Sequence, residues 1–265
     1  MRPGVRSAVY DRELNIEAYS FDGVVQEFPS HVHDYYVIGL IERGRRRLVC
    51  MGREYEVSAG DVLVFNPGDG HACTQLGGTL QYRALNIPRG VVLARLGRAP
   101  RFAPNVLRSA ALEDKLRILH TAVTKSEPGG EEALLALLGE LSCACGERAL
   151  PGGASEVERA RDYIERNFAQ HVALDDICRE VGMSKSALHR AFTASMGVTP
   201  YRYLESVRVG EARRLLENGV APADVADLCG FADQSHLTNC FGRLIGLSPG
   251  AYREIFCKDG DQYGK

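Results

Sequence analysis

Two stretches of this chain carry the same residue pattern, and that repeat constrains the fold more than any other feature. Leu188–Tyr203 reads L-x3-F-x4-G-x2-P-x2-Y, and Leu237–Tyr252 repeats it with identical spacing. Upstream of each copy an apolar residue, Ile177 or Val225, stands five positions before a glycine. Two copies are too few for a solenoid. The repeat instead predicts two helix-turn-helix units, each with a short helix, a turn and a recognition helix.

The second copy shows how its recognition helix would divide its two faces. Asp233 is a good N-cap, and apolar residues then recur at i, i+3, i+4, i+7 and i+8 from Leu237, which gives one buried face. The other face carries short polar side chains: Gln234, Ser235, His236, Thr238 and Asn239, together with Arg243. A helix that reads base edges in a DNA major groove needs such donors and acceptors. For any single residue, simple solvation remains the alternative.

At these residues the chain resembles the AraC/XylS family of bacterial transcription regulators. The segment GFADQSHLTNCFGRLIGLSPGAYR resembles that family's C-terminal signature almost end to end, and the likeness covers about Val157 to Phe256. The resemblance implies two recognition helices joined by a rigid linker helix, Tyr201 to Asn218, with Gly219 as its stop. The expected DNA-binding residues are Lys185, Ser186, His189 and Arg190 in the first unit and Gln234, Ser235, His236 and Asn239 in the second.

The charge of the C-terminal part argues against DNA binding. From Ser155 to Lys258 there are 13 basic and 14 acidic residues, and the whole chain carries a formal charge of −2. Counterion release is therefore weak unless the charge is segregated by face. Asn239 and Gly242 stand where family members often carry a basic residue. Fewer phosphate contacts favour a dimer or a partner protein, and a protein-only adaptor that has lost DNA binding stays open.

Residues 10 to 90 predict β-structure, because short runs rich in Val, Ile, Tyr and Leu alternate with Gly, Pro and Asp turns. The expected strands are Ile16–Phe21, Tyr35–Ile41, Arg45–Met51, Arg53–Val57, Asp61–Phe65 and Leu80–Ile87. Such a series suggests a sandwich or a barrel. The stretches HVHDYYVIGLIERG and SAGDVLVFNPGDGHA resemble the small cupin-type barrel found at the N-terminus of many AraC-family regulators, over about Asp22 to Pro88.

After Pro88 the pattern becomes helical. The stretch RGVVLARLGRAPRFAPN predicts a connector. Asn105 is expected to cap a helix over Val106–Lys125, and a stripe of leucines predicts a second helix from about Glu131 to Arg148. The family resemblance implies that this region also forms a dimer contact. The predicted fold class is α+β: a cupin-like effector-binding and dimerisation domain with a helical extension over 1–149, a linker over 150–155, an all-α DNA-binding domain over 156–256 and a tail over 257–265.

Three histidines, His31, His33 and His71, carry the likeness to the barrel. In cupin enzymes an equivalent set holds a metal with a following Glu, but Val37 and Ile38 occupy the expected Glu positions. Three imidazoles could still bind zinc or iron. A pocket lining that binds an effector is the preferred interpretation, and structural packing is the third. The expected effector-binding residues are His31, His33, Tyr35, His71 and Arg83, a mixed set that suits a small polar or anionic metabolite.

Other features limit the remaining function classes. No apolar run approaches a membrane span and the start lacks a signal-peptide core, so a cytoplasmic protein is expected. The eight Cys show no C-x-x-C zinc pair, and none has the setting of an activated nucleophile. We expect no enzyme activity and no cofactor. The expected partners are double-stranded DNA, a small-molecule effector, RNA polymerase and a second copy of the chain, with activation favoured by the resemblance. The alternative is a metal-dependent cupin oxygenase or isomerase with a DNA-binding tail.

Overall fold

The structure is a computed structural model that describes residues 4–147 and 155–257. Most of the linker expected over 150–155 and most of the tail expected over 257–265 lie outside the described residues. The contacts group the chain into two compact units: Met1–Glu27, His33–Asp69 and Cys73–Leu150 form the first, and Phe28–Val32, Gly70–Ala72 and Pro151–Lys265 form the second.

An eight-stranded sheet organises the N-terminal half. Its strands are β1 (Val5–Asp11), β2 (Ile16–Val24), β3 (Phe28–His31), β4 (Tyr35–Cys50), β5 (Arg53–Val57), β6 (Val62–Phe65), β7 (His71–Pro88) and β9 (Val106–Leu107). They follow the order β1-β2-β7-β4-β6-β9, with β3 paired to β7 and β5 to β4. Neighbours such as β1 and β2, or β4 and β6, run antiparallel. The strands of the described residues therefore pair into an open, cupin-like sheet and not into the expected barrel.

Glycines account for two differences from the expected strands. Tyr35–Ile41 and Arg45–Met51 form the single strand β4, because Gly44 continues the backbone at a φ of 98° instead of ending the strand. The side chains buried before Gly44 include Tyr35 and Val37, and those buried after it are Arg46, Leu48 and Cys50. Before the glycine odd and even positions are both buried, Tyr36 and Ile38 included, whereas after it only the even positions are buried. In the same way β7 begins at His71 rather than at Leu80, because Gly77 and Gly78 lie within the strand.

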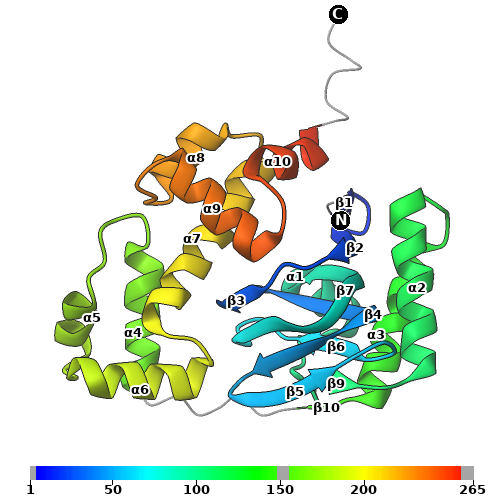
Figure 1. The fold of residues 1–265 in the computed structure, drawn as a ribbon, viewed down its shortest axis with the longest axis horizontal. Helices are drawn as coiled ribbons and strands as arrows, with labels where there is room; N and C mark the ends of the chain where they lie inside the picture. Colours follow the sequence, from blue (N-terminus) through cyan, green and yellow to red (C-terminus); the bar gives the residue numbers. More distant parts are fainter. Residues whose placement is uncertain (1–3, 148–154, 258–265) are drawn as a thin grey trace, which may run out of the picture. The chain divides into compact units, whose positions relative to one another are not determined.

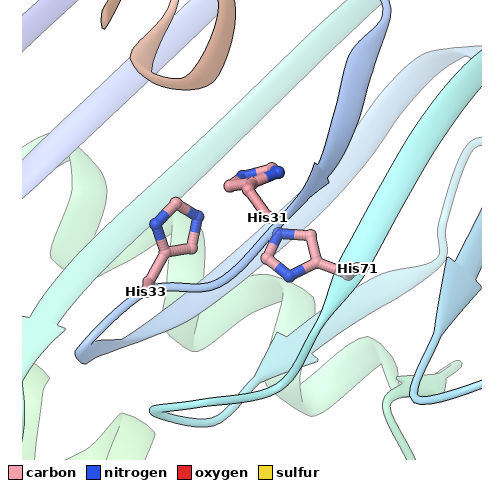
Figure 2. Close-up of side chains that lie close together, drawn as sticks. All are labelled: His31, His33 and His71. Atoms are coloured by element: carbon pink, nitrogen blue, oxygen red, sulfur yellow. The ribbon is translucent and has the colours of Figure 1, made fainter. Parts of the chain in front are cut away.

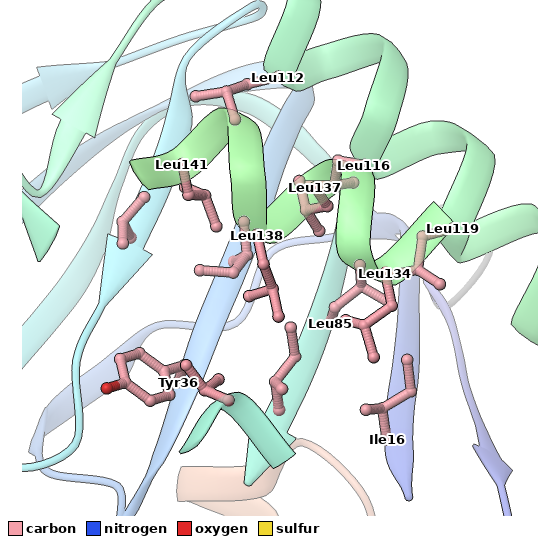
Figure 3. Close-up of a cluster of buried hydrophobic side chains, with 14 of the residues drawn as sticks. Ile16, Tyr36, Leu85, Leu112, Leu116, Leu119, Leu134, Leu137, Leu138 and Leu141 are labelled. Carbon is pink, nitrogen blue, oxygen red and sulfur yellow. The ribbon is translucent and has the colours of Figure 1, made fainter. Parts of the chain in front are cut away.

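Two helices cover one face of this sheet, α2 (Ala110–Lys125) and α3 (Gly130–Ala144). Figure 3 shows their leucines packed over Ile16, Tyr36 and Leu85 from the strands. The leucines at the centre of this core are Leu112, Leu116, Leu119, Leu134, Leu137, Leu138 and Leu141, each at most 1% exposed. Leu135, which the expected stripe included, is 45% exposed because the helix turns it away from the sheet.

Four expectations about this region were wrong. The connector after Pro88 contains helix α1 (Arg89–Leu96), whose Val91 and Val92 are buried. Helix α2 starts at Ala110, where the Ser109 side chain accepts a hydrogen bond from the Leu112 N–H. Asn105 does not cap a helix: it is fully buried and its Nδ2 donates to the Val64 carbonyl. The second helix ends at Ala144, and Gly146–Glu147 then forms β10, which pairs with β8 (Phe102–Ala103).

The helical unit contains the two predicted helix-turn-helix pairs. Its helices are α4 (Ser155–Asn167), α5 (Leu174–Val181), α6 (Lys185–Met196), α7 (Pro200–Glu217), α8 (Pro222–Leu228), α9 (Gln234–Ile245) and α10 (Pro249–Cys257). Figure 1 shows α4, α5 and α6 around one end of α7, and α8, α9 and α10 around the other. Recognition helix α9 begins directly after the Asp233 cap, as expected, and the linker helix α7 both begins and ends one residue earlier than expected.

Both copies of the repeat use their shared residues in the same way. The phenylalanine and the tyrosine of each copy pack edge to face, Phe192 with Tyr203 at 5.4 Å and Phe241 with Tyr252 at 5.3 Å between ring centroids. Each glycine ends its recognition helix in the left-handed conformation, and each proline begins the next helix. The spacing is therefore set by one Phe–Tyr core and one tight turn per unit. Among the described residues, no helix has the length and apolar character needed to cross a membrane.

Candidate functional site

Helix α9 presents the polar face that the sequence predicts. The Asp233 side chain caps the helix by accepting from the His236 N–H at 2.7 Å. The apolar face from Leu237 to Ile245 is buried in the unit. Gln234 and Asn239 are exposed, as are Ser235 and Thr238. The exposed groups therefore line one side of a capped helix and are available to hydrogen-bond base edges or phosphates.

His236 differs from the other residues of this face. It is half-buried, its Nδ1 accepts from the Ala232 N–H at 3.3 Å, and its ring packs edge to face on Phe231. These contacts close the turn before the helix. Arg243, at the other end, donates from Nη2 to Glu205 on α7 at 2.9 Å. Glu205 is 6% exposed and also accepts from Arg202, so this carboxylate helps to fix α9 on the linker helix.

Helix α6 presents a smaller polar face. Ser184 caps it, accepting from the Ala187 N–H, and Ser186, His189 and Arg190 are exposed. The Arg190 guanidinium donates to Ser186 Oγ at 2.9 Å within its own helix. Lys185 is paired with Asp175 at 2.8 Å, both of them exposed. Since an exposed pair is weak, Lys185 can exchange this carboxylate for a DNA phosphate at little cost.

The three histidines come together at the ends of two strands, as the sequence predicts. His31 ends β3, His71 begins β7 and His33 lies in the loop before β4, not on a strand as expected. Figure 2 shows the three rings directed toward one another, and their ligand nitrogens all lie within 4.8 Å of one another. His31 and His71 are 3% and 5% exposed, and His33 is half-buried. The cluster is therefore largely removed from water.

Local contacts set the charge and the orientation of this cluster. The Pro29 carbonyl lies 2.6 Å from His31 Nδ1, which directs the other ring nitrogen away from the backbone. Burial, helped by the nearby His71, lowers the pKa of His31 to about 3. His31 is thus neutral at physiological pH, and because its Nδ1 donates to the Pro29 carbonyl, its Nε2 can only accept a hydrogen bond. The ring of His33 stacks on Tyr35 at 4.6 Å, which joins the buried phenol to the cluster.

The cluster has the donors for a metal but lacks the fourth ligand of the cupin enzymes. Val37 and Ile38, at the positions expected for that ligand, are buried apolar residues, and Asp34 is exposed. Three imidazoles suit zinc or iron, with the remaining positions left to water or a ligand.

Arg83, the expected cationic partner, is already paired. Its Nε donates to Glu42 at 3.0 Å, and Glu42 also accepts from Arg117. The buried cation of the sheet is instead Arg46, which is 1% exposed. Sequence reasoning missed it because Arg45, Arg46 and Arg47 are consecutive and suggest a solvated strand. Alternation within RGRRR contained the signal, since Arg45 and Arg47 point outward to Glu56 and Glu54.

Tyr82 on β7 is a second residue that sequence reasoning missed. A Cβ atom on Gly39 of β4 would lie 1.9 Å from the Tyr82 hydroxyl oxygen, so the phenol occupies the space over this glycine. Its ring also contacts Phe21 on β2, with centroids 6.1 Å apart. The absence of a side chain at Gly39 is thus what admits the phenol.

Comparison with known proteins gives one family match in each half of the chain. The family model for an AraC-like ligand-binding domain matches residues 13–142, and the model for a helix-turn-helix domain matches residues 177–255. The chain is 40% identical over 272 residues to YbfI of Bacillus subtilis (strain 168), named as an uncharacterized HTH-type transcriptional regulator, covering 98% of this chain and 99% of YbfI. It is 28% identical to the HTH-type transcriptional activator RhaS of Klebsiella pneumoniae (strain 342), covering 86% of this chain and 88% of RhaS.

The solved structures support the fold. ToxT of Vibrio cholerae with bound unsaturated fatty acid aligns with a TM-score of 0.56 at 15% identity, covering 99% of this chain and 100% of ToxT. Together with the capped recognition helices and the ligand-binding match, these findings place the chain in the AraC/XylS family of DNA-binding transcription regulators.

Proposed function

We propose that this regulator responds to a small molecule bound by residues 1–149 and reads DNA through residues 156–256. The observation that carries the proposal is the pair of recognition helices, α6 and α9, joined by the single helix α7 and accompanied by a match to a ligand-binding domain. A coupling of roughly 1–3 kcal/mol between the two sites would be enough for a switch. The linker over 150–155 connects the two functions.

The proposed DNA contacts are the exposed polar side chains of the two recognition helices. They are Lys185, Ser186, His189 and Arg190 on α6 and Gln234, Ser235, His236 and Asn239 on α9. The bidentate amide and guanidinium groups, Gln234 and Arg190, suit adenine and guanine edges. His236 contributes chiefly by holding the turn, because its ring nitrogen is already bonded to the backbone. Lys185 supplies a phosphate contact once it leaves Asp175.

The near-neutral helical unit supports a dimer on DNA. Few of its cations are free of carboxylate partners, so one copy makes few phosphate contacts and a second copy doubles them. We propose that the protein acts in the cytoplasm as a homodimeric activator that recruits RNA polymerase. The name of RhaS, an activator, supports this sign of regulation. Its relatives are named as regulators rather than enzymes, and we propose no enzyme activity for this chain.

A map of the genomic DNA bound by the protein, with and without a metabolite extract, tests the proposal. Discrete sites near promoters whose occupancy changes with the extract are expected. If the sites are bound equally in all conditions, the protein binds DNA but does not respond to an effector in the extract. The absence of discrete sites would favour the protein-only adaptor.

The clustered histidines support one alternative, a metal-dependent cupin activity. Three imidazoles within 4.8 Å could hold zinc or iron. Metal analysis of the purified protein tests this directly. One equivalent of tightly held metal, lost in His71→Ala, would favour the alternative, and a metal-free protein that still answers to its effector would favour the pocket.

A further inference from the structure

Arg46 is a buried cation that the fold itself does not satisfy. Its Nη2 donates to the Val24 carbonyl at 3.0 Å, but Nε and Nη1 have no hydrogen-bond partner within residues 4–147 and 155–257. The side chain is 1% exposed, so water does not take their place at the surface. A guanidinium remains charged at physiological pH, and a buried charge with unused donors is costly. Such a group calls for a functional explanation.

No neighbouring group neutralises this charge in the described chain. The groups that interact electrostatically with Arg46 are Cys73 and Glu27. Burial raises the pKa of the Cys73 thiol to about 11, so this group is uncharged at neutral pH. Glu27 is exposed and is not an acceptor of the guanidinium. Water screens an exposed carboxylate, and it therefore compensates a buried cation poorly.

The other arginines of this sheet show what compensation looks like. Arg45 pairs with Glu56, and Arg47 pairs with Glu54 at 2.9 Å. Arg83 on β7 donates to Glu42 at 3.0 Å. A carboxylate therefore neutralises each of the outward-facing arginines and the half-buried Arg83. The fully buried Arg46 has no such carboxylate partner among the described residues.

A second unused polar group comes from the neighbouring strand. The Tyr82 side chain is half-buried, and no hydrogen bond joins its hydroxyl to another described residue. Burial raises its pKa, so the phenol keeps its proton and can donate. Strands β7 and β4 are adjacent in the sheet, and Cys73 interacts electrostatically with both Tyr82 and Arg46. Both donors therefore lie near the Cys73 thiol.

We propose that Arg46 and Tyr82 bind the carboxylate of a small organic acid, and that this acid is the effector; the inference rests on the effector-binding function proposed above. One guanidinium balances one negative charge, and a neutral phenol adds a donor without adding charge. This set suits a monocarboxylate better than a phosphate dianion, which needs more cations. A neutral sugar would leave the buried cation uncompensated. Leu48 and Val57, both fully buried beside Arg46, give the rest of the molecule apolar walls.

The first test needs no ligand. If Arg46 is held unpaired for an effector, Arg46→Met should leave the melting temperature of the ligand-free full-length protein unchanged or raise it by a few degrees, because an uncompensated charge is removed. Arg46→Gln serves as a second, polar variant. If Arg46 instead supports the fold, both variants should melt several degrees below the wild type, and that result would overturn the inference.

The second test uses acids and their amides. Thermal unfolding of the full chain is followed with acetate, hexanoate and benzoate, and with acetamide, hexanamide and benzamide as uncharged matches; chloride controls for ionic strength. At least one acid should raise the melting temperature of the wild type by about 5 °C at saturation, and its amide should not. Arg46→Met should weaken that acid about 10- to 100-fold, and Arg83→Gln should leave it unchanged. No shift with any acid, or an equal shift with the amide or with Arg46→Met, would overturn the carboxylate assignment.

The two proposals can fail separately. DNA binding is measured for the wild type and for Arg46→Met with a whole-metabolite extract. If the extract changes the DNA affinity of both proteins equally, the regulator has an effector but Arg46 does not bind it. If the extract changes neither while DNA binding is intact, the effector-binding function itself is wrong. A response lost only in Arg46→Met supports both proposals.

Discussion

Helix α7 should act as a rigid rod that fixes the spacing of the two recognition helices, and a proline in its interior should abolish that function. The helix has 18 residues, which at 1.5 Å per residue gives a length of about 27 Å. Adjacent major-groove entries on one face of DNA lie about 34 Å apart, so a straight helix of this length can join two helices that enter them.

Gly210 is the best position for this perturbation. A Cβ added there meets no other atom within 4 Å, so a new side chain disturbs no packing. Gly210→Pro removes the hydrogen bond from the residue 210 N–H to the carbonyl of Ser206 and places the ring against that carbonyl, which costs about 3 kcal/mol or more. Gly210→Ala is the matched control, expected to stabilise the same helix by about 1 kcal/mol.

The assay is equilibrium binding to the preferred DNA site and to a site whose two halves are moved apart by half a helical turn. When the rod is intact, the second unit binds as an intramolecular partner, an advantage of roughly 10²–10⁴ in affinity. Gly210→Pro should lose most of this advantage and become indifferent to the spacing, and Gly210→Ala should match the wild type. Circular dichroism checks that both variants fold. Undiminished affinity and spacing dependence in a folded Gly210→Pro protein would refute the rod.

Three further predictions concern the recognition face and the histidine cluster. Gln234→Ala should cost about 1–3 kcal/mol on the preferred site and little on random DNA, measured by competition; equal losses would exclude a base contact. Burial lowers the pKa of His31, so the unfolded chain binds a proton at this residue more readily than the folded chain does. The free energy of unfolding should therefore fall by up to about 1.4 kcal/mol per pH unit as the pH drops below 6.5, and His31→Asn should reduce that dependence on pH. His33→Ala and Tyr35→Phe should each weaken the effector response without changing effector-free DNA binding, and a chelator should change neither; a response abolished by the chelator would point to a bound metal instead.

The helical half could be predicted closely because its signals are local. Caps such as Asp233, the period of the apolar residues and the glycine stops act within one or two turns, and each copy of the repeat supports the other. The paired rings of Phe241 and Tyr252 come from two different helices, yet their recurrence at a fixed spacing already implied a common use.

The sheet was harder to predict because its glycines have two meanings. Gly44 resembles a turn, but in the structure it carries β4 onward into a stretch where alternate side chains are buried. Arg46 is one of them, although its sequence neighbours suggest solvent. Asn105 resembles an N-cap, but Nδ2 contacts to Asp69 and to the Val64 carbonyl hold it in the interior. Contacts between residues 36 to 41 positions apart leave no periodic trace in the sequence.

The histidine cluster lies between these cases. The spacing of His31 and His33 and the turn before His71 indicated a meeting point, and the structure brings the three rings together. His33 joins the cluster although it is not on a strand, because the loop before β4 directs its ring toward the other two histidines. The sequence did not indicate which arginine has a carboxylate partner. In the structure the half-buried Arg83 is bonded to Glu42, whereas Arg46 has no carboxylate partner among the described residues.

The most direct test of the central claim, that α6 and α9 read DNA together, is a genome-wide map of bound sites for the wild type, Arg190→Ala and Gln234→Ala. The wild type should enrich sites that share two short motifs about one helical turn apart. Arg190→Ala should blur one motif and Gln234→Ala the other, with the partner motif retained in each case. A single undivided motif, or two motifs that neither substitution alters, would contradict the tandem reading of DNA by these two helices.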